Sequence, residues 1–78
     1  MHYKNGREAR EGDSVIGPSY VGSHRIVAGT LHSLVASATH CNGQVAVPVP
    51  GGVAQNCVNV QDMLHAEDAF KAVTTPSA

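Results

Sequence analysis

The sequence predicts a mainly β domain, a small five- or six-stranded, partly open barrel with one short C-terminal helix or helical turn. Three observations support this fold class. Short stretches rich in Val and Ile alternate with glycine-rich turns along 78 residues, there is no Trp and a single Phe, and only 14% of the residues are charged. Short strands joined by tight turns are typical of small barrels, whose closure removes the strand edges that invite aggregation.

The N-terminal region predicts two turns followed by a strand. The Asn5-Gly6 pair fits a type I′ turn, because both residues tolerate a positive φ. The sequence Glu11-Gly12-Asp13 predicts a second turn, residues 14–17 predict a strand, and residues 17–24, which are rich in Gly, Ser and Pro, predict a loop.

Residues 25–36 form the longest predicted strand. Apolar residues occur in both registers, so we expect a β-bulge near Gly29 that switches faces and bends the strand. A helix is the alternative for this segment. Gly29, the β-branched residues and the absence of a capping residue argue against it.

A cleaner alternation follows the pair His40-Cys41. One face holds the apolar residues Cys41, Val45, Val47 and Val49, and the opposite face holds His40, Asn42 and Gln44. We therefore expect Cys41 to be a buried, free packing residue, since free cysteine behaves as a small hydrophobe. If Asn42-Gly43 is itself a hairpin turn, this assignment holds on only one side of it.

The chain after this segment predicts an edge and a turn. Pro48 and Pro50 cannot donate to a β-ladder, so the strand ends or runs along an edge there, and Gly51-Gly52 turns the chain. Residues 56–60 predict another strand, with either its two valines or Cys57 and Asn59 facing inward.

Residues 62–73 are compatible with two structures. The spacing of Met63, Ala66, Phe70 and Val73 fits a helix capped by Asp62, and a strand through Leu64 followed by one helical turn and a last strand is the alternative. We favour a short helix or helical turn over residues 66–71. Residues 1–73 then form a single domain, and residues 74–78 form a flexible tail.

Two stretches, "YKNGREAREGDSVIG" and "LHAEDAF", resemble small uncharacterised proteins of phages and prophages. Those proteins begin with a similar pattern, Asn-Gly-x-Glu-Ala-x-x-Gly-Asp-x-Val, and are expected to be small barrels of the Src-homology type. The similarity covers about a third of the chain and lies in turn and corner residues. It implies a phage-like accessory protein that interferes with or supports a host process, and it implies no catalytic residue.

Composition argues against several classes. Five Lys and Arg balance six Asp and Glu for a net charge of −1, whereas nucleic-acid binders usually carry a basic excess. No stretch approaches the roughly 18 to 20 apolar residues that span a bilayer, and the N-terminus lacks a signal-peptide core. We expect a cytoplasmic protein, in the host cell if phage-encoded, with no membrane association and with reduced cysteines.

Metal binding and catalysis have weak support. No two candidate metal ligands have the close Cys-x-x-Cys type of spacing. The candidates are Cys41, Cys57, His2, His24, His32, His40 and His65.

A Cys41–Cys57 disulfide requires neighbouring strands with Cα atoms within about 7 Å, and the expected reducing compartment argues against it. The carboxylates of Glu67 and Asp68 are expected to be solvated. We predict no metal, no cofactor and no enzymatic activity.

Polar residues, most of them uncharged, lie on or beside the central strands and in their connecting loop and remain as candidate ligand contacts: His24, Arg25, His32, Thr39, His40, Asn42 and Gln44. They suit hydrogen bonding to a small polar ligand such as a nucleotide. The first functional hypothesis is a homo-oligomeric, non-enzymatic phage protein that sequesters a nucleotide-like host signal and so counters a host defence. The second is a structural or protein-interaction module, such as a virion or assembly component. The third is a nucleic-acid-binding barrel.

Overall fold

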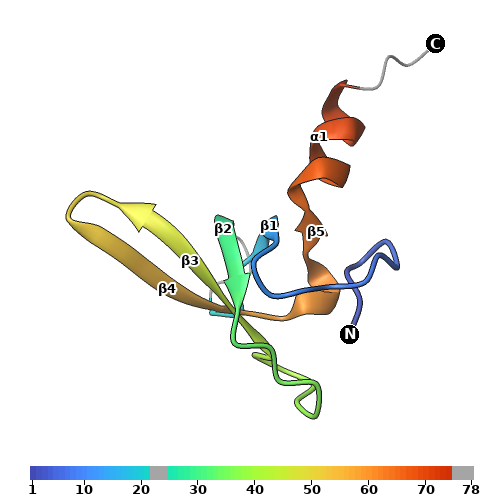
Figure 1. Ribbon diagram of the computed structural model, residues 1–78, viewed down its shortest axis with the longest axis horizontal. Helices are drawn as coiled ribbons and strands as arrows, with labels where there is room; N and C mark the ends of the chain where they lie inside the picture. Colours follow the sequence, from blue (N-terminus) through green and yellow to red (C-terminus); the bar gives the residue numbers. More distant parts are fainter. Residues whose placement is uncertain (22–24, 75–78) are drawn as a thin grey trace.

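A computed structural model describes residues 1–21 and 25–74 of the protein, with side chains up to Lys71. It is mainly β, as predicted, and Figure 1 shows its arrangement. Its elements are β1 (Ser14–Pro18), β2 (Ile26–His32), β3 (Gly43–Val49), β4 (Gly52–Val58), the 3-10 helix η1 (Val60–Asp62), β5 (Leu64–His65) and α1 (Ala66–Thr74).

The five strands form one antiparallel sheet in the order β4-β3-β2-β1-β5. The sheet curls without closing. A hydrogen bond of 2.9 Å from the Tyr20 N–H to the Cys57 carbonyl links the segment after β1 to the end of β4. The partly open barrel predicted from the sequence is therefore present. Among the described residues, no helix is long and apolar enough to cross a bilayer.

The inner face of the curled sheet carries the core. Residues at alternating positions point inward, as period-two strands require, and Leu31, Val45 and Val58 are completely buried. The N-terminal segment and η1, which are not part of the sheet, pack against this inner face. The core consists of Tyr3, Ala9, Val15, Val27, Leu31, Val45, Val58, Val60 and Met63.

The bulge expected near Gly29 is absent. The register of β1 against β2 runs without interruption from Ser14↔Thr30 to Pro18↔Ile26. β2 keeps one face inward and ends at His32, since the next residue, Ser33, has a φ of 54°. Gly29 has another role: a Cβ there would collide with the carbonyl of Ala46 on the neighbouring strand β3.

The hairpin of β3 and β4 forms an arm that reaches out on one side of the molecule, opposite α1 (Figure 1). β3 pairs with β2 only up to Ala46, and beyond it pairs with β4 alone. Pro48 lies in that outer half, where its missing N–H leaves no gap against β2. The turn between Val49 and Gly52 contains Gly51, whose φ is 87°.

The two N-terminal turns are present, with one correction. The Tyr3 carbonyl accepts the Gly6 N–H, and the Tyr3 N–H is donated to the Arg7 carbonyl. Gly6 has a φ of 90°, but Asn5 is not among the positive-φ residues, so the turn is not type I′. It has the hydrogen bonds of a three-residue hairpin loop. The second turn is closed by a bond from the Asp13 N–H to the Arg10 carbonyl.

The C-terminal region takes the strand through Leu64 from one alternative left open by the sequence and the helix from the other. Asp62 does not cap this helix, which begins at Ala66, and residues 66–74 form the helix where a last strand was the alternative. Leu64 and His65 pair with β1 as the short strand β5, and α1 follows directly. The helix predicted over residues 66–71 is confirmed. Thr74, assigned to the tail by the sequence, is the last residue of α1, and residues 75–78 lie outside the described residues.

Candidate functional site

An open groove of about 550 Å³ lies on the outer face of the sheet, between α1 and the arm. Its floor consists of two cross-strand pairs, Ser14 with Thr30 and Ile16 with Ala28. Residues from α1 form one wall, and Pro48 of β3 lies on the other side. The groove is lined by Ser14, Val15, Ile16, Ala28, Gly29, Thr30, Pro48, Ala66, Ala69 and Phe70.

The lining of this groove is almost entirely apolar. Among the described lining residues there is no ionisable side chain, and the hydroxyls of Ser14 and Thr30 are the polar side-chain groups. Phe70 is 69% exposed at the rim. Small-molecule sites are typically clefts of about 300–1,000 Å³ with mostly apolar walls and a few placed polar groups. The volume of the groove therefore falls within the range of small-molecule sites, and its described walls are mostly apolar.

The outer face continues beyond the groove into a polar patch, which we define as His32, Gln44 and Gln55. On β2, Thr30 and His32 are successive outward residues, about 7 Å apart along the strand. His32 pairs with Gln44 across β2 and β3, and its Nε2 bonds Gln55 Oε1. Because Oε1 can only accept, Nε2 carries the proton. The Nδ1 of His32 bonds Ser33 Oγ at 2.8 Å.

Of the candidates that the structure describes, His32 and Gln44 lie together, and Arg25, Thr39, His40 and Asn42 lie elsewhere. Arg25 lies exposed before β2, and the Thr39 carbonyl accepts a bond from Gln61. His40 is exposed, with its ring centroid 6.3 Å from that of Tyr20. His24 lies outside the described residues.

Asn42 serves the fold. Its Oδ1 accepts the buried Val60 N–H at 2.8 Å, and its Nδ2 donates to Gln61 Oε1 at 2.9 Å. The side chain is buried, with 6% of the residue exposed. Asn42-Gly43 is not a turn, because β3 begins at Gly43. The amide that sequence reasoning placed on the ligand face instead ties the segment before β3 to η1.

The prediction for Cys41 is wrong. Cys41 lies before β3 rather than on its apolar face, has a φ of 49°, and forms a disulfide with Cys57. The two Cα atoms are 5.3 Å apart, within the usual range for a disulfide. Cys57 is opposite Gln44 on the outer face. The disulfide therefore fastens the loop between β2 and β3 to β4, beside the polar patch.

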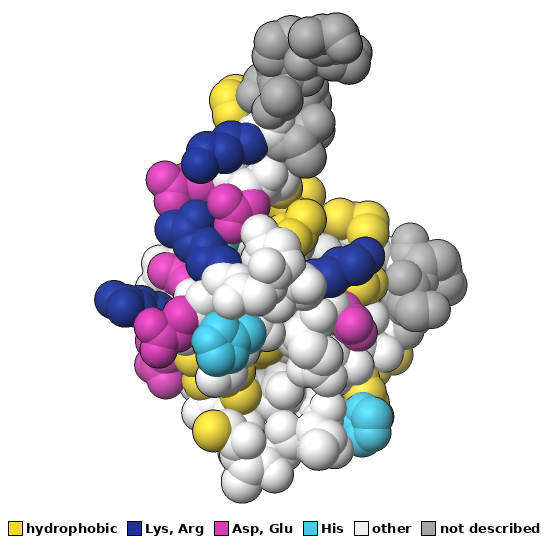
Figure 2. Space-filling view, turned by 90° about the vertical axis from the view of Figure 1, so that its right-hand side faces the viewer, with side chains coloured by type: hydrophobic (Ala, Val, Ile, Leu, Met, Phe, Trp, Pro, Cys, Tyr) yellow, Lys and Arg dark blue, Asp and Glu magenta, His cyan; other side chains and the backbone are white. Residues whose placement is uncertain are grey.

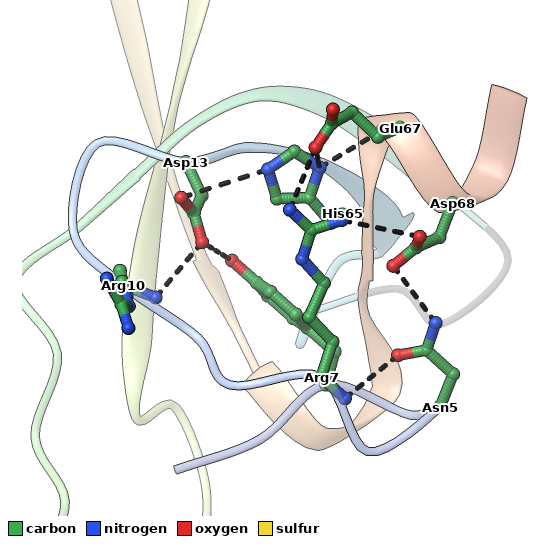
Figure 3. A network of polar contacts seen from close by, with 8 residues as sticks. Asn5, Arg7, Arg10, Asp13, His65, Glu67 and Asp68 are labelled. Atoms are coloured by element: carbon green, nitrogen blue, oxygen red, sulfur yellow. Dashed lines mark hydrogen bonds and ion pairs between the residues drawn. The ribbon is translucent and has the colours of Figure 1, made fainter.

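A second group of polar residues joins the N-terminal segment to β5 (Figure 3). The Tyr3 hydroxyl donates to Asp13 Oδ2 at 2.6 Å, and the Arg10 N–H donates to the same oxygen at 3.0 Å. His65 Nε2 lies 3.8 Å from Asp13 Oδ1. His65 Nδ1 accepts the Glu67 N–H at 3.0 Å, so this nitrogen is already occupied as an acceptor.

The network continues to the first turn of α1. Arg7 bonds Glu67 at 2.8 Å and Asp68 at 3.3 Å, and Asn5 donates to Asp68 at 3.0 Å. The side chain of Glu67 is solvated as expected, at 64% exposure, whereas that of Asp68 is 21% exposed, and both carboxylates also bond the N-terminal hairpin loop. The bond from Arg7 lowers the pKa of the Glu67 carboxyl below its usual value. The bond from Asn5, and then that from Arg7, lower the pKa of the Asp68 carboxyl in the same way.

The electrostatics of this network favour a structural role. Burial and the bond to Asp13 raise the pKa of the Tyr3 hydroxyl far above 10, so it stays protonated. Burial opposes ionisation of Asp13, but the bonds from Tyr3 and Arg10 prevail and lower the pKa of its carboxyl. A proton-relay role would require a free basic nitrogen on His65, and both its nitrogens face partners.

Acidic and basic side chains lie next to one another on the face drawn in Figure 2. Within the described part of the chain, no three His, Cys, Asp or Glu side chains lie close enough to hold a metal ion.

Sequence reasoning missed the groove and the network. The groove depends on Ser14, Ala28 and Thr30 meeting α1, and small or hydroxyl residues give no recognisable motif. The network joins residues about 60 positions apart. Its one sequence signal is the alternation of charges in residues 7–13, which does not name the partner. Comparison with protein-family models, with curated proteins and with solved structures finds no match.

Proposed function

We propose that the chain is a non-enzymatic binding protein that works as a homo-oligomer and sequesters a small, nucleotide-like molecule. The open groove between α1 and the outer face of the sheet is the observation that carries this proposal. A phage-like accessory role, in which the captured molecule is a host defence signal, follows from the N-terminal resemblance.

The groove suits the base of a nucleotide. A heterocyclic base is flat and buries its faces well against apolar walls, while its edge needs a few hydrogen-bond partners. Ile16, Ala28 and Ala69 offer such walls, and the paired hydroxyls of Ser14 and Thr30 offer donors and acceptors at the floor. Both hydroxyl groups can adapt to either role.

The polar patch suits the remainder of the ligand. His32 and Gln44 lie on the same face as the groove, one step further along their strands. They offer hydrogen bonds to a ribose or phosphate oxygen. None of the described residues that line the groove is a cation, so the phosphate charge requires an arginine from elsewhere. Arg25 of a neighbouring copy is our candidate, and this is one reason to propose an oligomer.

The lining of the groove favours binding over catalysis. General acid–base chemistry needs a titratable group within reach of the substrate, and no described residue of the lining has one. The titratable residues nearest to an active-site arrangement, Asp13 and His65, belong to the network that holds the N-terminal segment. We therefore propose no enzymatic activity.

The cellular location is a prediction with two opposing arguments. A phage-like accessory protein is expected in the host cytoplasm. The Cys41–Cys57 disulfide favours an oxidising compartment, because cytosolic thiols are normally kept reduced. Alkylation of the protein in freshly lysed cells, followed by mass measurement, decides between them: two adducts indicate the cytoplasm, and none indicates oxidation.

A structural or protein-interaction role is the second candidate. The observation in its favour is the arm, on which Val49 and Val53 are 41% and 58% exposed. This candidate requires a protein partner and no small ligand. A nucleic-acid-binding role is third, and it requires binding that weakens steeply with salt.

The test is a thermal-shift screen of the purified protein against linear and cyclic nucleotides. Binding to the folded state raises the melting temperature. Ala69→Trp fills the groove and should abolish the shift. Ala36→Trp, at an exposed position of the loop between β2 and β3, is the matched control and should keep it. No shift with any nucleotide, or an equal shift in both variants, contradicts the proposal.

A further inference from the structure

β4 is one edge of the sheet, and part of that edge has no partner among the described residues. Val49 and Gly52 flank a two-residue turn, so they form a hydrogen-bonded pair. From there, non-hydrogen-bonded and hydrogen-bonded pairs alternate along β3 and β4. The N–H and C=O groups of Val53, Gln55 and Cys57 therefore point away from β3. The Cys57 carbonyl is bonded by Tyr20. The backbone groups of Val53 and Gln55 remain open to another strand.

This edge lacks the features that usually prevent strand pairing. Natural edge strands are protected by charged side chains, proline, bulges or very short length. β4 has seven residues, none charged and none proline, and its register against β3 is continuous. Val53 is also 58% exposed beside the open backbone groups.

The charge pattern indicates which partner fits. From residue 41 to residue 60 the sequence has no Asp, Glu, Lys, Arg or His. In a two-fold interface the residues beside the axis lie close to their own copies, so a charge there would face a like charge. The arm is free of this repulsion along its whole length. Its edge is therefore suited to a second copy of the same strand.

We propose that two copies of this chain pair through β4, antiparallel, with the two-fold axis near Ala54. The inference rests on the oligomeric state in the proposed function and adds the surface that forms it. Val53 of each copy then lies opposite Gln55 of the other. The N–H and C=O groups of both residues are hydrogen-bonded to the other copy on each strand. The two five-stranded sheets become one continuous sheet.

This arrangement affects the polar patch. Gln55, which bonds His32, lies on the outer face together with Val53. In the dimer, Val53 of the neighbouring copy covers Gln55 from the side and shields its bond to His32 from water. The second copy would therefore fix the orientation of the patch at the end of the groove.

The test measures the mass of the protein in solution by sedimentation over a wide concentration range. Val53→Lys places two like charges beside the two-fold axis and should reduce the assembly from paired to single chains. Val35→Lys, at an exposed valine of the loop between β2 and β3, is the matched control and should leave the mass unchanged. Circular dichroism shows whether each variant is folded.

A second measurement does not depend on a variant. In the wild type, hydrogen exchange at the Val53 and Gln55 amides should slow as concentration rises. A wild type of one-chain mass at every concentration, an unchanged mass in Val53→Lys, or concentration-independent exchange overturns the proposal. Nucleotide binding by a single-chain wild type would overturn the edge pairing and leave the groove assignment intact.

Discussion

Asn42 offers a sharp test of whether the residues chosen from sequence serve binding or folding. The proposed perturbation is Asn42→Ala. In the native protein the Asn42 side chain accepts the N–H of Val60, a residue that is completely buried. Alanine removes the acceptor and leaves this donor without a partner or access to water.

The structure gives the magnitude of the loss. An unsatisfied buried donor costs about 1–3 kcal/mol, and the lost bond to Gln61 adds about 0.5–1.5 kcal/mol. We expect a total near 2–4 kcal/mol, a large part of the ~5–15 kcal/mol that stabilises a typical domain. In a domain of this size, 2 kcal/mol corresponds to a fall in melting temperature of roughly 8–16 °C.

The assay is equilibrium unfolding in urea, followed by circular dichroism. Asn42→Asp is the control, because its carboxylate still accepts the Val60 N–H but cannot donate to Gln61, and it should lose less than the alanine variant. An Asn42→Ala protein within about 0.5 kcal/mol of wild type, a typical surface effect, would refute the structural role. Loss of ligand binding with unchanged stability would return Asn42 to the ligand face.

Three further predictions follow from the disulfide and the polar network. Reduction of Cys41–Cys57, which are 16 residues apart, should lower the free energy of unfolding by about 3 kcal/mol, and equal melting with and without dithiothreitol contradicts this. The pKa of Tyr3 is raised in the folded state, so its contribution to the free energy of unfolding is complete below pH 10 and falls as the pH rises above 10. In urea titrations, the stability of Tyr3→Phe should therefore fall less steeply with alkaline pH than that of wild type. The pKa of Asp13 is lowered in the folded state, so its contribution to the free energy of unfolding is present above pH 4 and is lost as the pH falls below 4. The stability of Asp13→Asn should therefore change less between pH 4 and 2 than that of wild type, and an equal change in both proteins would contradict the network.

Much of the fold could be predicted from local pattern. The valines of β3 alternate, the turns carry Gly at positive φ, and helical spacing marks the residues of α1. These features depend on neighbours in the sequence. The predicted bulge at Gly29 was wrong because the glycine is needed for the close approach of the Ala46 carbonyl, which is distant in the sequence. A glycine in a strand fits either a bulge or a close approach of backbone, and the sequence alone does not distinguish them.

The candidate site could be predicted only in part. His32 and Gln44 share a face because strand periodicity places them there. Cys41 and Asn42 were misplaced because the alternation was extended backwards past the true start of β3, at Gly43. The groove could not be predicted, since it forms only when α1 folds over β1.

The central claim is that the groove binds a nucleotide-like ligand, and amide chemical-shift mapping with the nucleotide panel tests it most directly. The account predicts shifts at Ala28, Thr30 and Ala69 in the groove, with smaller shifts at His32 and Gln44. Absence of shifts with every nucleotide, or shifts confined to residues outside the groove and the polar patch, would contradict it.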